Sequence, residues 1–102
     1  MHNIVDRAWA AGSDAAIIES IRNDMTYTKV AAMKKLAPDT GSYMNEADKF
    51  DPDYLQDFYG EHLERLEAIK EEYDPESVFY CPTCVGSEKW AEDESGRLCQ
   101  VA

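Results

Sequence analysis

The sequence contains little cysteine, few glycines and prolines, few positive charges and no long hydrophobic run. Its 102 residues include three cysteines, five glycines, four prolines, and 10 lysines and arginines against 21 aspartates and glutamates. No apolar stretch approaches the roughly 18–20 residues that a membrane-spanning helix requires. The first residues also lack the apolar run of a secretory signal. These absences argue against a membrane span and an exported precursor, and we predict a cytoplasmic protein.

Negative charge is concentrated in the second part of the chain. Residues 1–40 carry no net charge, whereas residues 41–102 carry a net charge of −11. Such an acidic surface repels nucleic-acid phosphates and anionic lipids, so we expect neither nucleic acid nor a membrane as a partner. With 44% hydrophobic residues, a chain of this length is expected to form a single globular domain over residues 1–102.

Apolar residues between Ile17 and Leu36 recur every three or four positions, which is typical of an amphipathic helix. Ser13 is a suitable N-cap before this stretch. Pro38 follows it and excludes the preceding residue from helical dihedral angles. The pattern predicts a helix over about residues 14–36.

A second amphipathic helix is predicted over about residues 52–73. Asp51 and Pro52 match an N-cap followed by proline at the first helical position. Apolar residues then recur at helical spacing from Leu55 to Tyr73. Two such helices form a thin layer, and their apolar stripes need another protein surface to pack against. The chain is therefore expected to be a piece of a larger fold or a self-associating unit.

Two residues inside the second helix need an explanation. Gly60 costs about 1 kcal/mol relative to alanine in a helix, and either the close approach of a neighbour or a tolerated weak position accounts for it. His62 lies on the apolar stripe, so we expect a packed, hydrogen-bonded histidine.

The remaining segments predict little regular structure. Residues 42–47 are expected to be extended, residues 77–80 to form a brief strand, and residues 81–102 to form an irregular tail with Trp90 as its anchor. The predicted fold class is therefore α+β, mainly helical, with two long amphipathic helices joined by a short extended segment.

Cys81 and Cys84 form a C-x-x-C pair, and Cys99 follows near the end of the chain. Two thiolates at this spacing can bind zinc, but a complete site needs two more ligands, such as Cys99 with His62 or His2. No second C-x-x-C pair and no H-x-x-x-H motif is present, so we predict no metal site. We expect ordinary tail cysteines, and a disulfide and a metal site are the two alternatives that the sequence leaves open.

Tyr43 and Asn45 lie on the segment that is predicted to be extended. Alternate side chains of an extended segment point to the same side, which places a phenol beside a carboxamide. A phenol can act as a general base, and a carboxamide can both donate and accept hydrogen bonds. From this spacing alone, a packed tyrosine explains the pattern better than a catalytic one.

Longer stretches of sequence are more specific than these short patterns. They are Gly41-Ser-Tyr-Met-Asn-Glu-Ala-Asp48, Asp57-Phe-Tyr-Gly-Glu-His-Leu-Glu-Arg-Leu66 and Ile69-Lys-Glu-Glu-Tyr-Asp-Pro-Glu-Ser-Val-Phe79. In this order and spacing they resemble the C-terminal region of berberine bridge enzyme-like oxidases. Residues 85–90 and 96–99 look like the tail of fungal members, so the resemblance covers about residues 31–102.

The resemblance implies the vanillyl-alcohol-oxidase fold and the FAD-linked oxidation of a small secondary metabolite. It implies that Tyr43 faces the substrate as a catalytic base and that Asn45 contacts the flavin. The FAD-binding domain of this family lies upstream of such a region. We therefore expect this chain alone to lack FAD, because one amide contact cannot offset the cost of ordering a cofactor, and to need an FAD-domain partner chain.

Two alternatives stay open beside the oxidase interpretation. One is a flavin-independent isomerase, cyclase or dehydratase that uses the same scaffold as a homo-oligomer, with Tyr43 as acid or base. The other is a noncatalytic interaction module. The start at Met1 and the helix that follows Ser13 favour a free-standing gene product, whereas the intact Tyr-x-Asn pair favours a flavin or substrate role.

Overall fold

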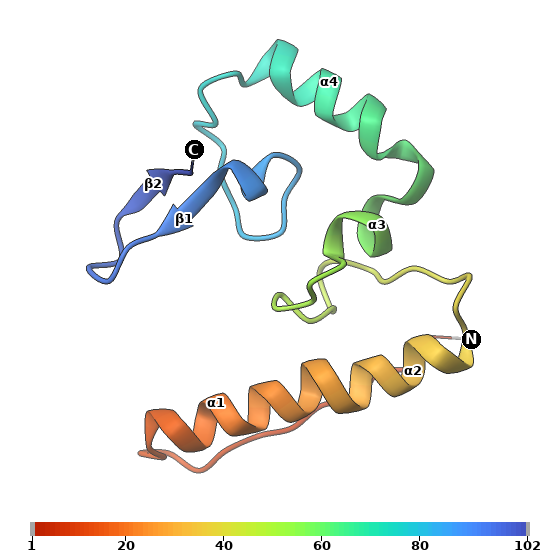
Figure 1. The fold of residues 1–102 in the computed structure, drawn as a ribbon, viewed down its shortest axis with the longest axis vertical. Helices are drawn as coiled ribbons and strands as arrows, with labels where there is room; N and C mark the ends of the chain where they lie inside the picture. Colours follow the sequence, from red (N-terminus) through yellow and green to blue (C-terminus); the bar gives the residue numbers. More distant parts are fainter. Residues whose placement is uncertain (1, 102) are drawn as a thin grey trace. The chain divides into compact units, whose positions relative to one another are not determined.

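The computed structural model describes residues 2–101. The chain divides into two compact units, with the boundary between Thr40 and Gly41 (Figure 1). The charge changes at the same boundary, since the acidic excess begins with the second unit. The fold class is α+β and mainly helical, as predicted, with a two-stranded sheet near the C-terminus.

The first unit is built on one continuous helical run. Helix α1 covers Ala15–Asp24, the π-helical segment η1 covers Met25–Val30, and α2 covers Ala31–Leu36. The apolar spacing does not mark the wider π turn, so the sequence predicted one uninterrupted α-helix here. No helix within residues 2–101 combines the length and the apolarity that crossing a bilayer requires.

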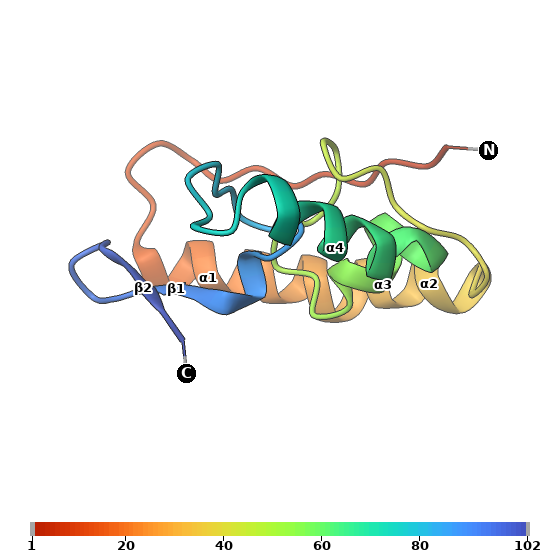
Figure 2. The ribbon, with the colours of Figure 1, turned by 90° about the horizontal axis from the view of Figure 1, so that it is seen from above.

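The start of this run differs from the prediction. Asp14, and not Ser13, is the N-cap residue. The Ser13 hydroxyl instead donates a hydrogen bond to the Ala10 carbonyl at 2.8 Å, which closes a turn before the helix. Gly12 has a φ of +81° in this turn, a conformation that glycine adopts without steric cost. Figure 2 shows the preceding residues doubling back along the helical run.

The second unit contains a broken helix where the sequence predicted a continuous one. Helix α3 covers Tyr54–Tyr59, the 3₁₀ turn η2 covers Gly60–His62, and α4 covers Leu63–Tyr73. The break lies at Gly60, which has φ +53° and ψ −134°. A Cβ at Gly60 would meet nothing within 4 Å, so neither close approach nor a weak helical position explains this glycine. Its positive φ does.

Two further expectations for this region are wrong. His62 is exposed and is not packed on an apolar stripe, because the break at Gly60 changes the helical phase before it. Helix α3 begins two residues later than predicted, with Asp53 as N-cap. The Asp51 carboxylate accepts the Asp53 N–H at 3.0 Å, which forms a turn that competes with helix at these positions.

The predicted irregular tail contains a β-hairpin. Strand β1, Trp90–Glu92, pairs antiparallel with β2, Leu98–Gln100, and Ala91 lies opposite Cys99. A short 3₁₀ turn, η3, covers Ser87–Lys89 before it. Residues 77–80 form no strand, so that expectation is also wrong.

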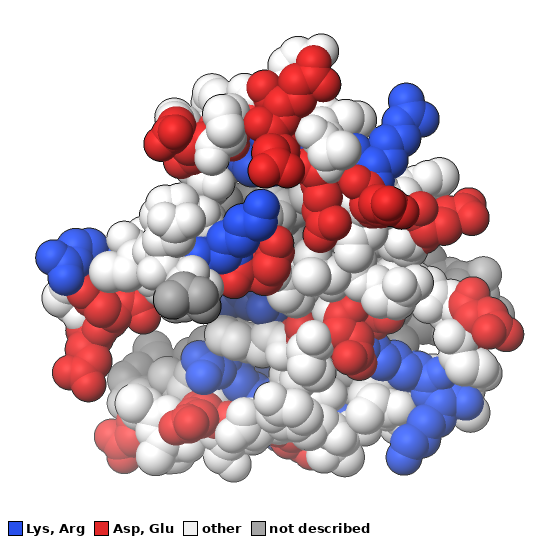
Figure 3. Space-filling model, turned by 45° about the horizontal axis from the view of Figure 1, so that its top comes forward, with Lys and Arg blue, Asp and Glu red and all other residues white. Residues whose placement is uncertain are grey.

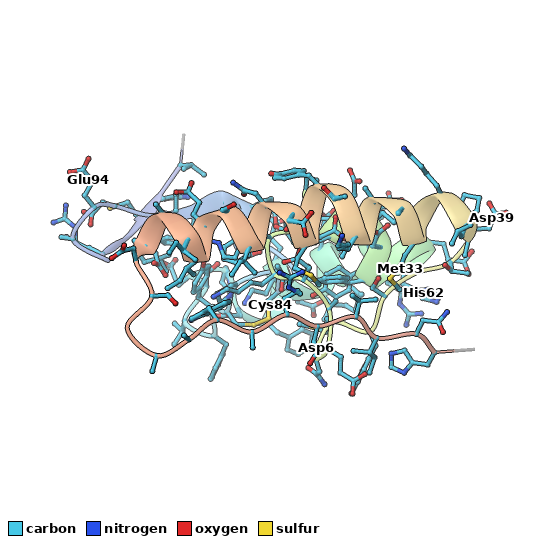
Figure 4. All side chains as sticks on the ribbon, turned by 90° about the horizontal axis from the view of Figure 1, so that it is seen from below. Asp6, Met33, Asp39, His62, Cys84 and Glu94 are labelled. Atoms are coloured by element: carbon cyan, nitrogen blue, oxygen red, sulfur yellow. A yellow bond between two sulfur atoms is a disulfide. The ribbon has the colours of Figure 1, made fainter. Side chains whose placement is uncertain are left out.

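Asp93 organises the hairpin loop. Its carboxylate accepts the backbone N–H groups of Ser95 at 2.9 Å and Arg97 at 3.0 Å. Gly96 supplies a φ of +79°. Figure 4 shows Glu94 at the tip of this loop, directed away from the ribbon. The Asp-x-Ser-Gly sequence is a turn signal that the expectation of an irregular tail overlooked.

None of the apolar side chains among residues 2–101 is buried. Large ones with more than half of their surface exposed include Tyr27, Leu36, Tyr73, Val78 and Phe79. Folded domains cover such faces with a second layer of structure. The described residues do not provide that layer.

Candidate functional site

Tyr43 and Asn45 meet on an exposed turn of the second unit. The Asn45 Nδ2 group donates a hydrogen bond to the Tyr43 phenolic oxygen at 2.7 Å. The predicted extended segment is replaced by a turn, in which the Glu46 N–H donates to the Tyr43 carbonyl at 3.0 Å. The phenol and the carboxamide therefore lie side by side as expected, but the turn brings them together and strand alternation does not.

The turn is attached to the C-terminal end of α3. The Ser42 N–H donates to the Asp57 carbonyl at 2.8 Å. Gly41 permits this approach, because a Cβ there would lie 2.4 Å from the same carbonyl oxygen. The Met44 sulfur lies 3.7 Å from the phenolic oxygen of Tyr59. The residues on both sides of Tyr43 are thus held by α3.

Tyr59 joins this turn to the loop that contains the C-x-x-C pair. Its phenol donates a hydrogen bond to the Thr83 carbonyl at 2.8 Å. Burial raises the pKa of Tyr59 above its ordinary value, the nearby Tyr54 adds to the rise, and a backbone hydrogen bond from Val85 opposes it. The neutral phenol is therefore the favoured form. The sequence placed Tyr59 only on an apolar stripe and carried no signal for this role.

The cysteines are divided between a disulfide and a thiol. Cys81 and Cys84 form a disulfide with a Cα–Cα distance of 5.4 Å, at the position labelled for Cys84 in Figure 4. Cys99 is a free thiol that donates to the Asp93 carboxylate at 3.9 Å. In the part of the chain that the structure describes, no three side chains of the metal-binding types gather into a metal site.

The Tyr43–Asn45 pair presents polar atoms on the surface of the second unit. Tyr43 is 60% exposed, and the carboxamide of Asn45 has a second N–H and an oxygen that can contact a ligand. The concave surface near Lys70, Phe79 and Cys84 is too shallow to enclose a small molecule and does not include the pair. The described residues therefore form no enclosed pocket around the pair.

The surface of the second unit is strongly acidic. Figure 3 shows red carboxylate side chains gathered in the upper part of the picture, over α4. This helix carries Glu64, Glu67, Glu71 and Glu72. The acidity favours solvent or a basic partner surface on this face.

Comparison with known proteins extends these observations. Residues 42–86 match the family model described as "Berberine and berberine like". The chain is 48% identical over 87 residues to the FAD-linked oxidoreductase hmp9 of Hypomyces subiculosus, and the aligned segment covers 85% of this chain and 14% of that protein. It is 45% identical over 93 residues to the FAD-linked oxidoreductase patO of Aspergillus clavatus, and the aligned segment covers 91% of this chain and 16% of that protein.

A solved structure supports the same relationship. The VAO-type flavoprotein MtVAO713 from Myceliophthora thermophila C1 superposes with a TM-score of 0.83 at 44% identity, over 87% of this chain and 16% of that one. The chain thus spans about one sixth of the length of the proteins that it matches. The resemblance found in the sequence is confirmed: residues 42–86 match the berberine and berberine-like family model, and the chain is similar to one part of fungal FAD-linked oxidoreductases and of a VAO-type flavoprotein.

Proposed function

We propose that this chain forms one side of the flavin–substrate site of an FAD-linked oxidoreductase that acts on a small secondary metabolite. The FAD-binding part comes from a partner chain or from further sequence of a longer protein. The observation that carries the proposal is the 2.7 Å contact between Asn45 and Tyr43 on an exposed turn, inside the segment that matches the berberine and berberine-like family.

Each residue of the pair has a role in this proposal. A bound FAD would supply the hydride acceptor for the oxidation. Tyr43 acts as the base in its phenolate form, whose oxygen takes up the proton that the substrate releases and becomes the phenol. The Asn45 N–H that donates to this oxygen stabilises negative charge on it and fixes the direction of the ring. The remaining polar atoms of the Asn45 carboxamide contact the cofactor.

The unburied apolar faces support the need for further protein. Leu36 in the first unit and Phe79 in the second are each at least 80% exposed. Covering such side chains contributes about 1.5–3 kcal/mol each. A larger flavoprotein would provide that cover, together with the phosphate-binding elements that this chain lacks in its sequence.

The first test asks whether the chain completes a flavoprotein. The purified chain, with and without added FAD, and a chimera of MtVAO713 that carries this chain in place of the matching segment are run on a sizing column with detection at the visible flavin band. We expect the chain alone to elute colourless and the chimera to elute yellow. A chimera that is folded by circular dichroism but colourless contradicts the proposal and favours the flavin-independent alternative.

The second test assigns the role of Tyr43. In the yellow chimera, Tyr43→Phe should lower turnover of a substrate of the parent flavoprotein by about 10²-fold or more, because general base catalysis is removed, while flavin retention stays the same. Tyr73→Phe is the matched control, since this tyrosine of the same unit is 77% exposed and lies outside the turn. Equal turnover in the two variants would rule out the catalytic role.

A further inference from the structure

The Cys81–Cys84 disulfide closes a loop of four residues. Thr83 inside it has a φ of +64°, which is rare for a β-branched residue. Its hydroxyl donates to the Pro82 carbonyl at 2.6 Å, and the Cys84 N–H donates to the Cys81 carbonyl at 3.1 Å. The closed loop therefore fixes the direction of the Thr83 carbonyl.

The Thr83 carbonyl accepts the hydrogen bond that the Tyr59 phenol donates. The Tyr59 phenol has one proton, and the 2.8 Å distance to the Thr83 oxygen shows where it is donated. The same phenolic oxygen lies 3.7 Å from the Met44 sulfur. Met44 stands between Tyr43 and Asn45 in the sequence. Three segments of the second unit thus meet at one hydroxyl group.

We infer that Tyr59 is a positioning residue that couples the Cys81–Cys84 disulfide to the Tyr43–Asn45 pair, so that a dithiol reductant displaces the pair. A loss of turnover on reduction would follow only if the proposed function is correct, so that part of the inference rests on the proposed function. The coupling itself does not, because it involves only contacts within this chain.

The chemical step is thiol–disulfide exchange. A thiolate of the reductant attacks one sulfur of the Cys81–Cys84 bond, and its second thiol resolves the mixed disulfide. Two electrons and two protons pass to the cysteines, which become thiols, while the dithiol becomes a disulfide. Both cysteines are partly exposed, so a reductant can reach them.

Opening the loop alters the acceptor for Tyr59. When the disulfide no longer closes the loop, the Thr83 backbone can leave its positive φ, and this change turns the Thr83 carbonyl away from Tyr59. A partly buried phenol then lacks its partner, and an unmatched buried polar group is destabilising. Tyr59 moves to find another acceptor, and the packing of Met44 against it changes. The helices and the β-hairpin keep their own hydrogen bonds.

The experiment uses the isotope-labelled chain in solution, without FAD. The Asn45 side-chain amide and its nuclear Overhauser contact with the Tyr43 ring are measured before and after reduction with dithiothreitol. Cysteine Cβ shifts report the state of the disulfide. We expect reduction to shift the Asn45 amide and weaken the contact, and reoxidation to restore both. Tyr59→Phe should produce the displaced signals already in the oxidised form, with a smaller response to reduction.

Controls separate this coupling from general unfolding. Cys99→Ser should respond as the wild type does, because Cys99 lies outside the disulfide. The amide signals of β1 and β2 should stay in place throughout. An Asn45 amide that does not move when the Cys81–Cys84 bond is fully reduced would overturn the inference. If the coupling is seen but Tyr43→Phe leaves turnover unchanged, only the proposed function fails.

Discussion

Gly41 is the residue that lets the turn with Tyr43 lie against α3. Its importance comes from space and not from an unusual φ. A Cβ at this position would lie 2.4 Å from the Asp57 carbonyl oxygen, and that oxygen also accepts the Ser42 N–H at 2.8 Å. A backbone carbonyl cannot rotate away as a side chain can, so the turn itself would have to move.

Gly41→Ala should therefore detach the turn. We expect it to lower the free energy of local opening at Ser42 by about 1–3 kcal/mol, as overpacking against fixed atoms does, and to displace Tyr43. Hydrogen exchange of the Ser42 amide measures this change.

The control is another glycine of the same unit. Gly60→Ala meets no atom within 4 Å but has a φ of +53°, so its cost of about 1–3 kcal/mol is backbone strain located between α3 and α4. The Ser42 amide should keep its protection in this variant. Unchanged exchange at Ser42 in Gly41→Ala would disprove the steric role of that glycine.

At the scale of elements, the C-terminal end of α4 is held by one carboxylate. Asp74 pairs with the Lys70 ammonium and accepts the N–H groups of Val78 at 2.8 Å and Phe79 at 3.1 Å. Lys70 also donates to the Phe79 carbonyl at 3.1 Å. The hydrogen bond from Lys70, followed by those from the backbone, lowers the pKa of Asp74 below its ordinary 3.8.

A lowered carboxyl pKa stabilises the folded turn above the ordinary pKa, and this contribution is lost as the pH falls through the lowered value. We predict that residues 74–79 keep their structure at neutral pH and open on acidification below the ordinary pKa of 3.8. Amide exchange of Val78 and Phe79 across an acid titration measures the transition.

Asp74→Asn should open the same turn already at neutral pH, since it removes the charge that Lys70 pairs with. Asp93→Asn is the matched control, because the Asp93 carboxylate organises the hairpin loop and its pKa is also lowered, first by the Ser95 hydroxyl. The Asp93→Asn variant should loosen the hairpin and leave the Val78 and Phe79 amides protected from exchange. Protected Val78 and Phe79 amides in Asp74→Asn would contradict the prediction.

At the scale of the whole molecule, the main fact is that no apolar side chain of residues 2–101 is buried. Contiguous exposed apolar surface marks an interaction site or a tendency to associate. We predict that the purified chain sediments with a mass above 11.6 kDa at micromolar concentration, binds a hydrophobic dye and unfolds over a broad temperature range.

The double variant Val78→Ser, Phe79→Ser tests the source of this behaviour, because these neighbours are 76% and 80% exposed. It should reduce dye binding and the sedimenting mass. A wild-type monomer that binds no dye and unfolds in one sharp transition would show that these faces need no cover.

Local patterns determined the helical regions and the candidate pair. Apolar spacing predicts helices because side chains three or four residues apart lie on the same face of a helix, so the information lies within a few positions. The Tyr-x-Asn spacing likewise placed Tyr43 and Asn45 together, since only one residue separates them. The resemblance to berberine bridge enzyme-like oxidases also came from the order of residues along the chain.

Only the tertiary structure decided how these pieces are connected. The break at Gly60 depends on a backbone angle that the apolar pattern does not contain, and the pairing of Cys81 with Cys84 depends on the path of the loop. Tyr59 reaches Thr83 across 24 positions and Met44 across 15. Contacts between residues so far apart arise from the course of the backbone in space, because no local hydrogen bond or periodicity links them.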